Sequence, residues 1–570
     1  MKKKLFVLLL VMAILLTSCQ VSELELDGEK MVDHSLDTAG LYGVGYMKLF
    51  VTDESQVFNA WGEKYGNKEH QTFFKELNAF EPHTVVTQMW YPSAKVKEAQ
   101  YDHLGQEPMA SGDDVYMRDL YIQDEYFQKE LARSSISSLT RKDGKDMRTL
   151  LNESTEEEFK KITSELVDEA LNRKLDSKMN APVAEGKFPV IVMAHGLGGT
   201  GYMWNESAEA LASQGYIVVA PTFVSDGSMP EVFSNPNSIV GKKSEEEVHD
   251  YYLKLQNQGN VVENFFKYLY GTELDMKAAE ASGSFDEMMN QIKASKAPAD
   301  GGILATEMMG DLFDQRVKDV EAIIVDLKVM NLKGDFAGKI DIDSIGMTGH
   351  SLGSITTMVA LERLDDIKVG LGINNGVPVK WEPDDLEDKE ITKPLFLLHG
   401  QEDDFLDLIF KNVWQDMYIP QGGDINKTYV LADERVKATP DNPDPILTAT
   451  YNRANGPKIA VEVQNSDHGN LIEDTFSYYP TAGDQDWKVT IEKPRMLSKG
   501  LLNTGLFIEK FNLISSEKLE DGYILNQAGF IRDYYLKAWF GYYLKGQEEY
   551  FEFIFDTPFE EAVKVKSDNF

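Results

Sequence analysis

The chain has 570 residues, of which 42% are hydrophobic and 11% aromatic, and its formal net charge is −37 at pH 7. This composition is that of a globular protein, and the length allows one large domain with insertions or two domains. The negative charge argues against nucleic acid and anionic lipid surfaces as partners of the bulk protein, and we interpret it as a solvated acidic surface.

The N-terminal segment is typical of a bacterial lipoprotein leader. Three lysines at positions 2–4 precede the apolar run 5–16, which is too short for a comfortable transmembrane helix. The run closes on Leu-Thr-Ser-Cys19, which resembles the lipoprotein box, and Cys19 is the only cysteine of the chain. We expect a signal peptide over 1–18, a lipid on Cys19 and a polar tether over 19–40. An ordinary signal peptide with an incidental cysteine is the alternative.

Residues 41–570 form one predicted domain in which strands and helices alternate. The expected strands include one that begins at Ile345, together with Tyr46–Thr52, Thr84–Trp90, Pro189–Ala194, Tyr216–Ala220, Val369–Ile373, Leu395–Leu398 and Ile459–Val463. The expected helices are Trp204–Gln214, Phe313–Leu332, Ser354 to about Arg363, and Ile531–Leu544. Long crossovers between short apolar strands predict an α/β fold with a mostly parallel central sheet covered by helices on both faces.

Two long segments interrupt this alternation and are predicted to be insertions. Residues from about 95 to 180 are charged and helical in pattern, and we expect them to decorate the sheet rather than belong to it. Residues 225–310 are polar and helix-prone and fall between two strands. This second insertion is a candidate cap over the site.

The sequence Gly349-His350-Ser351-Leu352-Gly353 ends an apolar run and opens a helical pattern. Such a Gly-x-Ser-x-Gly turn between strand and helix strains the serine and exposes its hydroxyl above the sheet. The two glycines are expected where strand and helix cross too closely for a β-carbon. The motif can occur by chance, but its strand-turn-helix context favours Ser351 as a nucleophile.

A serine nucleophile needs a base, which is most often a histidine oriented by a carboxylate. Only two histidines follow Ser351 in the sequence, His399 and His468. His399 ends a predicted strand and is expected to pack there. His468 lies in a loop beside Gly469, so it can reach over the sheet edge, and we predict that it is the base.

The carboxylate is expected between the nucleophile and the base in chain order, after the end of a strand. Asp403 lies five residues after the predicted strand Leu395–Leu398 and is our candidate, with its neighbour Asp404 as an alternative acid. Asp467, next to the histidine, is more typical of a solvated loop residue.

The loop after Ala194 is expected to complete an oxyanion hole, with the backbone N–H groups of Leu197 and Leu352 as donors. Residues 196–201 also match G-x-G-x-x-G after a strand, which would suggest a dinucleotide site. Such a site would want an acidic residue at the end of the next strand, which instead ends at Thr222. We therefore favour the oxyanion interpretation.

Together, Tyr91-Pro92, the segments 189–199 and 349–353, and Asp467 to Asn470 resemble the secreted platelet-activating factor acetylhydrolase family of α/β-hydrolases. The resemblance covers roughly residues 40–92, 185–225 and 313–545. It implies the α/β-hydrolase fold and a calcium-independent, lipase-like esterase that cleaves short or oxidised acyl groups.

The same resemblance maps Ser351 and His468 onto the family's nucleophile and base, and Leu197 and Leu352 onto its oxyanion donors. One departure concerns the acid, which in that family follows the strand just after the nucleophile helix. Here that strand ends in Asn374-Asn375-Gly376, and asparagine cannot stabilise an imidazolium as a carboxylate does. We expect the acid one strand later, at Asp403.

These observations predict a serine carboxylic-ester hydrolase, lipid-anchored in the bacterial cell envelope outside the cytoplasm, that acts on a small-molecule or lipid ester. A Ser-His-Asp triad implies no cofactor and no metal, and we expect no nucleic-acid partner. A serine peptidase on the same fold and an inactive hydrolase-like binding lipoprotein are the alternatives. The sequence does not indicate an oligomeric state.

Overall fold

The computed structural model describes part of the chain, and the account below concerns that part. The described residues are 40–66, 68–94, 112–120, 139–141, 171–172, 174–226, 230–256, 301–374, 376, 390–400, 403, 450–451, 453–463, 466, 468, 471, 491–494, 527–555 and 563–570. The leader with Cys19, the tether and the alternative acid Asp404 lie outside it.

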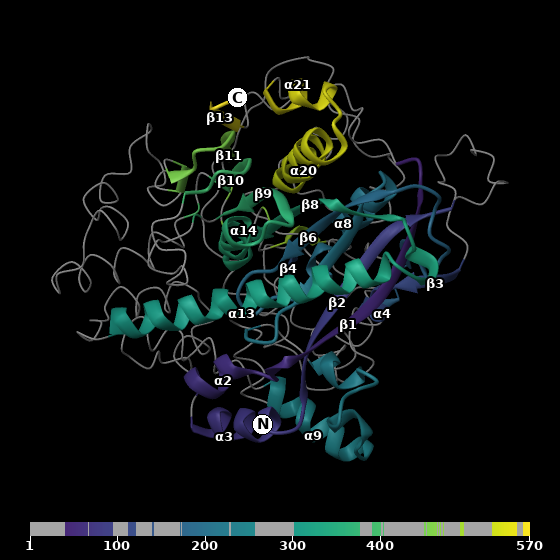
Figure 1. The fold of residues 1–570 in the computed structure, drawn as a ribbon, viewed down its shortest axis with the longest axis vertical. Coiled ribbons are helices and arrows are strands. Elements are labelled where there is room, and N and C mark those ends of the chain that lie inside the picture. Colours follow the sequence, from purple (N-terminus) through teal and green to yellow (C-terminus); the bar gives the residue numbers. More distant parts are fainter. Residues whose placement is uncertain are drawn as a thin grey trace.

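A large sheet organises the molecule (Figure 1). Its strands are β1 (Gly43–Val57), β2 (Pro82–Ser93), β3 (Asp113–Tyr116), β5 (Lys174–Met179), β6 (Phe188–Ala194), β7 (Ile217–Thr222), β8 (Ile340–His350), β9 (Ile367–Ile373), β10 (Leu395–Gly400), β11 (Lys458–Val463) and β13 (Val563–Asp568). They follow the spatial order β13-β11-β10-β9-β8-β6-β7-β2-β1-β5-β3. A separate pair is formed by β4 (Leu139–Arg141) and β12 (Ile491–Pro494).

The centre of the large sheet is parallel. The six neighbouring strands from β11 to β7 all run in the same direction. β2 is antiparallel to both of its neighbours, and β13 and β3 close the two edges with antiparallel pairs. This open, mostly parallel sheet, with β2 reversed inside it and a reversed strand at each edge, is the α/β-hydrolase fold.

Helices cover both faces of the sheet, as a parallel sheet requires. The helices of the described part are α2 (Ala60–Tyr65), α3 (Lys68–Asn78), α4 (Met117–Leu120), α8 (Asn205–Ser213), α9 (Glu245–Gln256), α13 (Gly301–Met330), α14 (Leu352–Arg363), α20 (Gln527–Lys545) and α21 (Glu549–Phe555). Short 3-10 turns are η1 (Gly201–Trp204), η2 (Pro230–Ser234), η3 (Val240–Lys242) and η4 (Gly334–Phe336). α13 and α14 share one core with the sheet, and α8 and α20 share the other.

Strand β6 shows how one short apolar run serves both cores. Val190 and Val192 join the cluster beneath α13 and α14, whereas Ile191 and Met193 join the cluster beneath α8 and α20. Successive side chains of a strand point to opposite faces, so a strand covered on both sides must be apolar at every position. All seven residues of β6 are buried for this reason.

A smaller assembly of helices lies beyond the end of β7. Phe74 of α3 packs with Phe233 of η2 and Leu255 of α9 in a third apolar cluster. β2 is antiparallel to β7 and pairs Val86 with Thr222, so this cluster lies at the edge where the parallel strands end. In Figure 1, α2, α3 and α9 stand together below the sheet, and α13 crosses in front of it. The described part of the insertion 225–310 therefore packs at the edge where β8 delivers Ser351.

The predicted central elements are confirmed, with changed ends. α13 begins twelve residues earlier than the predicted start at Phe313, and β1 extends past both ends of its prediction. The aromatic stripe of the last long helix was expected to be core packing, and Tyr534, Trp539 and Phe540 of α20 are indeed buried.

The prediction that residues 95–180 lie outside the sheet is wrong for two segments. β5 pairs in parallel with β1, matching Ser177 to Val44, and β3 pairs with β5. β5 carries charged residues at alternate positions, with Lys174 and Asp176 exposed and Leu175 buried. Charges near a sheet edge limit edge-to-edge association, and they made this stretch resemble a polar helical surface.

No helix in the described part of the chain combines the length and apolarity needed to cross a membrane.

Candidate active site

Ser351 stands at the sharp turn between β8 and α14. Its backbone angles are φ 56° and ψ −119°, a left-handed conformation that a residue with a side chain adopts only under constraint. A β-carbon on Gly349 would collide with the backbone of Gly353, and one on Gly353 would collide with the carbonyl of Ala194. The expectation that both glycines permit a close crossing is confirmed.

Three side chains named from the sequence meet at this turn. Nε2 of His468 lies 3.0 Å from Oγ of Ser351, and Nδ1 of His468 lies 2.8 Å from Oδ2 of Asp403. A carboxylate only accepts, so Nδ1 carries the proton and Nε2 is left to accept from the serine hydroxyl. All three residues are buried.

His468 is also held by its backbone. Its carbonyl oxygen accepts from Nε2 of His350 at 2.8 Å and from Nδ2 of Asn374 at 2.9 Å. Burial and the charge of the nearby His468 ring hold the pKa of His350 well below its usual value. His350 is therefore neutral at neutral pH and adds no positive charge beside the imidazole of His468.

Asn374 links the loop of His468 to the strand that leads to Asp403. Its side-chain oxygen accepts from the N–H of Gly400 at 2.8 Å, while its amide nitrogen donates to the carbonyl of His468. Asn374 has φ 53°, a conformation that asparagine tolerates better than most residues. Sequence reasoning treated Asn374 only as a missing acid and did not foresee these two contacts.

The other strand-end histidine lies where it was expected. His399 is buried within β10, in register with Glu462 of β11. Asp467 and the alternative acid Asp404 lie outside the described residues.

The loop after β6 lies against Ser351. A β-carbon placed on Gly196 would be 3.2 Å from Cβ of Ser351, so this glycine allows the loop to approach the turn. The next residue is Leu197, whose N–H was predicted as an oxyanion donor. The second predicted donor, Leu352, is the first residue of α14, and the first N–H groups of a helix have no acceptor within it. Leu197 and Leu352 thus flank Ser351 from two elements.

A buried ion pair supports the same loop and was not predicted. Nε and Nη2 of Arg316, on α13, donate to the two carboxylate oxygens of Asp226, and both side chains are fully buried. The backbone carbonyl of Asp226 accepts from Gly198 N–H at 3.1 Å. Asp226 lies at the start of the insertion 225–310 and Arg316 lies just after its end, ninety positions later, so no local pattern in the sequence pairs them.

His195 opens this loop and is fixed in one tautomer. Its Nε2 accepts from the N–H of Phe223 at 3.0 Å, so the proton is on Nδ1, which donates to the carbonyl of Gly196 at 2.6 Å. Burial, aided by the positive charge of Arg316, lowers the pKa of His195 to about 4. His195 is therefore a neutral structural residue of the loop.

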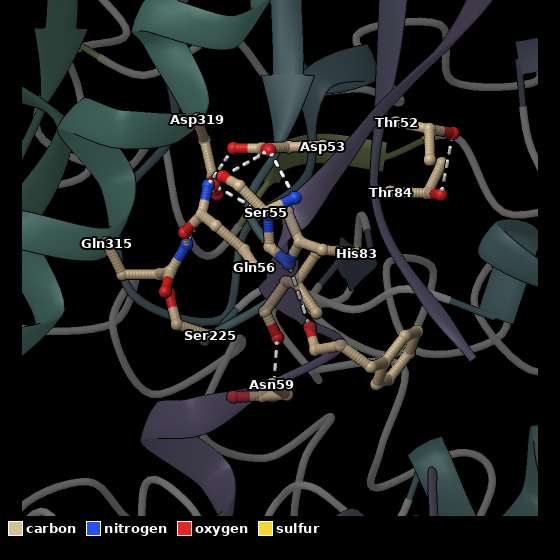
Figure 2. Close-up of polar contacts among 12 residues, drawn as sticks. Thr52, Asp53, Ser55, Gln56, Asn59, His83, Thr84, Ser225, Gln315 and Asp319 are labelled. Atoms are coloured by element: carbon tan, nitrogen blue, oxygen red, sulfur yellow. Dashed lines mark hydrogen bonds and ion pairs between the residues drawn. The ribbon is translucent and has the colours of Figure 1, made fainter. Parts of the chain in front are cut away.

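One turn further along α13, a second buried pair ties the helix to the first two strands (Figure 2). Nε2 of His83 lies 2.7 Å from Asp319, and Nδ1 lies 2.9 Å from the carbonyl of Phe58. Both partners only accept, so His83 carries both protons and is a cation. Burial lowers the pKa of His83, but the Asp319 carboxylate outweighs it and the net pKa is raised. Gln315 joins this network by donating to Asp319 and Gln56.

Within the described residues, no group of three or more histidine, cysteine, aspartate and glutamate side chains is arranged to hold a metal ion.

Comparisons with known proteins give partial matches. The family model described as chlorophyllase matches residues 156–240. Among solved structures, a ferulic acid esterase from Streptomyces cinnamoneus is similar with 13% sequence identity, over 92% of this chain and 96% of that one, at a TM-score of 0.43. No curated protein matches this chain. The match to the chlorophyllase family covers the loop after β6 and the elements around it, which is less than half of the chain.

Proposed function

We propose that this protein is a serine carboxylic-ester hydrolase. The observation that carries the proposal is the continuous contact from Asp403 through His468 to Ser351 at a strained strand-to-helix turn. A hydroxyl attacks an ester only when a base removes its proton, and the arrangement supplies both the base and the group that orients it. The partial similarity to chlorophyllase supports ester chemistry.

In the proposed mechanism, Nε2 of His468 takes the proton from Ser351 as Oγ attacks the ester carbonyl. The oxyanion that forms is bound by the N–H groups of Leu197 and Leu352. The imidazolium of His468, stabilised by Asp403, then protonates the leaving alcohol. A water molecule, deprotonated by the same histidine, hydrolyses the acyl-enzyme and frees Ser351.

The substrate class follows from the family resemblance and is also a proposal. We infer that the acyl groups are short or modified, as in the platelet-activating factor acetylhydrolases. The insertion 225–310 packs, in its described part, at the edge of the sheet where Ser351 stands. A cap in this position would limit the length of the acyl chain.

The direct test combines active-site labelling with a substrate series. A fluorophosphonate should modify the purified enzyme once, on the peptide that contains Ser351. p-Nitrophenyl esters from acetyl to palmitoyl should be hydrolysed with a preference for short chains, and the matching anilides far more slowly. Faster turnover of anilides would favour a peptidase. Absence of both labelling and hydrolysis would favour a binding protein.

We also propose that the mature protein is anchored by a lipid on Cys19. The Cys19→Ala variant should leave the membrane fraction and should lose incorporation of a fatty-acid probe, because no other thiol can accept the lipid. Fractionation of cells that express either form measures this. A processed variant that remains as membrane-bound as the parent would refute the anchor.

A further inference from the structure

We infer that Arg316, paired with Asp226, is the positioning residue that aims the oxyanion-binding N–H groups at Ser351. The inference rests on the proposed function and goes beyond it, because Arg316 belongs to neither the triad nor the oxyanion hole. It acts through the backbone of the loop 195–199.

Each of the five N–H groups of the Arg316 guanidinium has an acceptor. Two bonds go to Asp226. Nη1 donates to the carbonyl of His195 at 2.9 Å and to Oγ1 of Thr356 at 3.2 Å, and Nη2 lies 3.4 Å from the carbonyl of Gly196. Two consecutive loop carbonyls are therefore drawn towards one cation.

The direction of these carbonyls sets the direction of the neighbouring N–H groups. In a trans peptide the C=O and the following N–H point to opposite sides. The carbonyl of Gly196 faces Arg316 and Nδ1 of His195, so the N–H of Leu197 faces away from both. Without these donors the peptide could turn over, and the oxyanion would lose one of its two N–H partners.

The same arginine also reaches the other half of the proposed hole. Thr356 on α14 accepts from Arg316 and donates to the carbonyl of Leu352 at 2.8 Å. Arg316 thus connects the loop that carries Leu197 to the first turn that carries Leu352. The spacing between the two donors is fixed by one rigid, planar group.

A purely stabilising role does not account for a charge in this place. A buried ion pair costs desolvation that apolar residues of similar volume would avoid, so packing alone gives no reason for arginine and aspartate here. The face of the Phe223 ring lies 4.5 Å from the guanidinium carbon and keeps the cation in one orientation. Apolar packing would not orient the backbone of the loop, whereas the N–H donors of Arg316 fix the directions of the loop carbonyls.

The test replaces the pair without leaving a buried charge. In the Arg316→Met/Asp226→Leu variant, kcat on p-nitrophenyl acetate should fall about 10- to 100-fold with KM changed less than about twofold. This is less than the factor of about 10²–10³ for complete loss of one oxyanion donor, because the N–H of Leu197 is misoriented and not removed. The affinity for an aryl trifluoromethyl ketone, which forms an oxyanion on Ser351, should fall by the same factor as kcat. Hydrogen exchange in the peptide that covers 195–199 should become faster, while the melting temperature stays near the parental value.

The matched control is Arg363→Met. Arg363, the last residue of α14, pairs with Asp314 on α13, so it joins the same two helices at the end of α14 far from Ser351. This variant should keep parental kcat, ketone affinity and loop exchange.

If the double variant kept the parental kcat and the parental affinity for the ketone, the inference would be wrong and the ion pair would have only a structural role. If the unmutated enzyme neither hydrolysed esters nor bound the ketone, the proposed function would be refuted instead. Loop exchange would then still decide whether Arg316 orders the loop.

Discussion

Replacing Ser351 with alanine should lower kcat for ester hydrolysis by about 10⁶, and replacing His468 with alanine should lower it by a similar factor. The double variant should be no slower than either single variant. The two side chains are 3.0 Å apart, and in the proposed mechanism they act in one proton transfer, so removal of either would abolish the whole step. Residual turnover would come from substrate binding and from the oxyanion donors, which both variants keep.

A second serine in the same helix provides the control. Ser354 is buried one turn into α14, and its hydroxyl faces Gly372 of β9. Ser354→Ala should keep kcat within about threefold of the parent and should still react with a fluorophosphonate. Additive losses in the double variant, or phosphonate labelling of Ser351→Ala, would mean that a different nucleophile carries the reaction.

The centre of the fold could be predicted because it depends on local patterns. β6 and β10 are short, fully buried and mostly apolar runs, and a strand buried on both faces needs no polar alternation. Strand β5, which lies next to the edge strand β3, could not be predicted in this way. It is half solvent-facing and charged, and its pairing with β1 is decided by tertiary contacts.

The candidate triad could be located because parallel strands deliver their ends to the same edge of the sheet. Ser351 follows β8, Asp403 follows β10 and His468 follows β11, so chain order and strand ends were enough to choose them. The choice between Asp403 and Asp404 could not be made from the sequence, because both follow the same strand. In the structure, Asp403 contacts the imidazole.

The supporting contacts could not be predicted from local patterns. Arg316 and Asp226 are brought together only when α13 folds back over the sheet after the insertion. The role of Asn374 depends on the carbonyl of His468, ninety-four residues later, which no pattern in the sequence identifies. The orientation of the site therefore depends on long-range contacts that become visible only in the folded chain.

The acid is where this chain departs from the family that it resembles, and Asp403→Asn tests it. The variant should remain folded and lose about 10³–10⁴ in kcat, because a neutral amide cannot stabilise the imidazolium and can stabilise the wrong tautomer of His468. Asp404→Asn should have a far smaller effect. Hydrolysis of p-nitrophenyl acetate by both variants, with folding checked by thermal melting, is the deciding measurement. If Asp403→Asn folded and kept a near-parental kcat, Asp403 would be excluded as the acid. A large loss of kcat only in Asp404→Asn would assign the acid to Asp404.

Adding a carboxylate at the position that the family resemblance implies should not restore activity. Nδ2 of Asn374 donates to the carbonyl of His468, and its Oδ1 accepts from Gly400, so this side chain faces backbone groups. In Asn374→Asp/Asp403→Asn, the new carboxylate would oppose the carbonyl oxygen of His468 and lose a hydrogen bond worth about 1 kcal/mol. We therefore expect the double variant to be no faster than Asp403→Asn, and Asn374→Asp alone to be slower than the parent. Recovery of most activity in the double variant would show that the imidazole of His468 can reorient to bind a carboxylate at the end of β9. The acid could then follow either β9 or β10 in this fold.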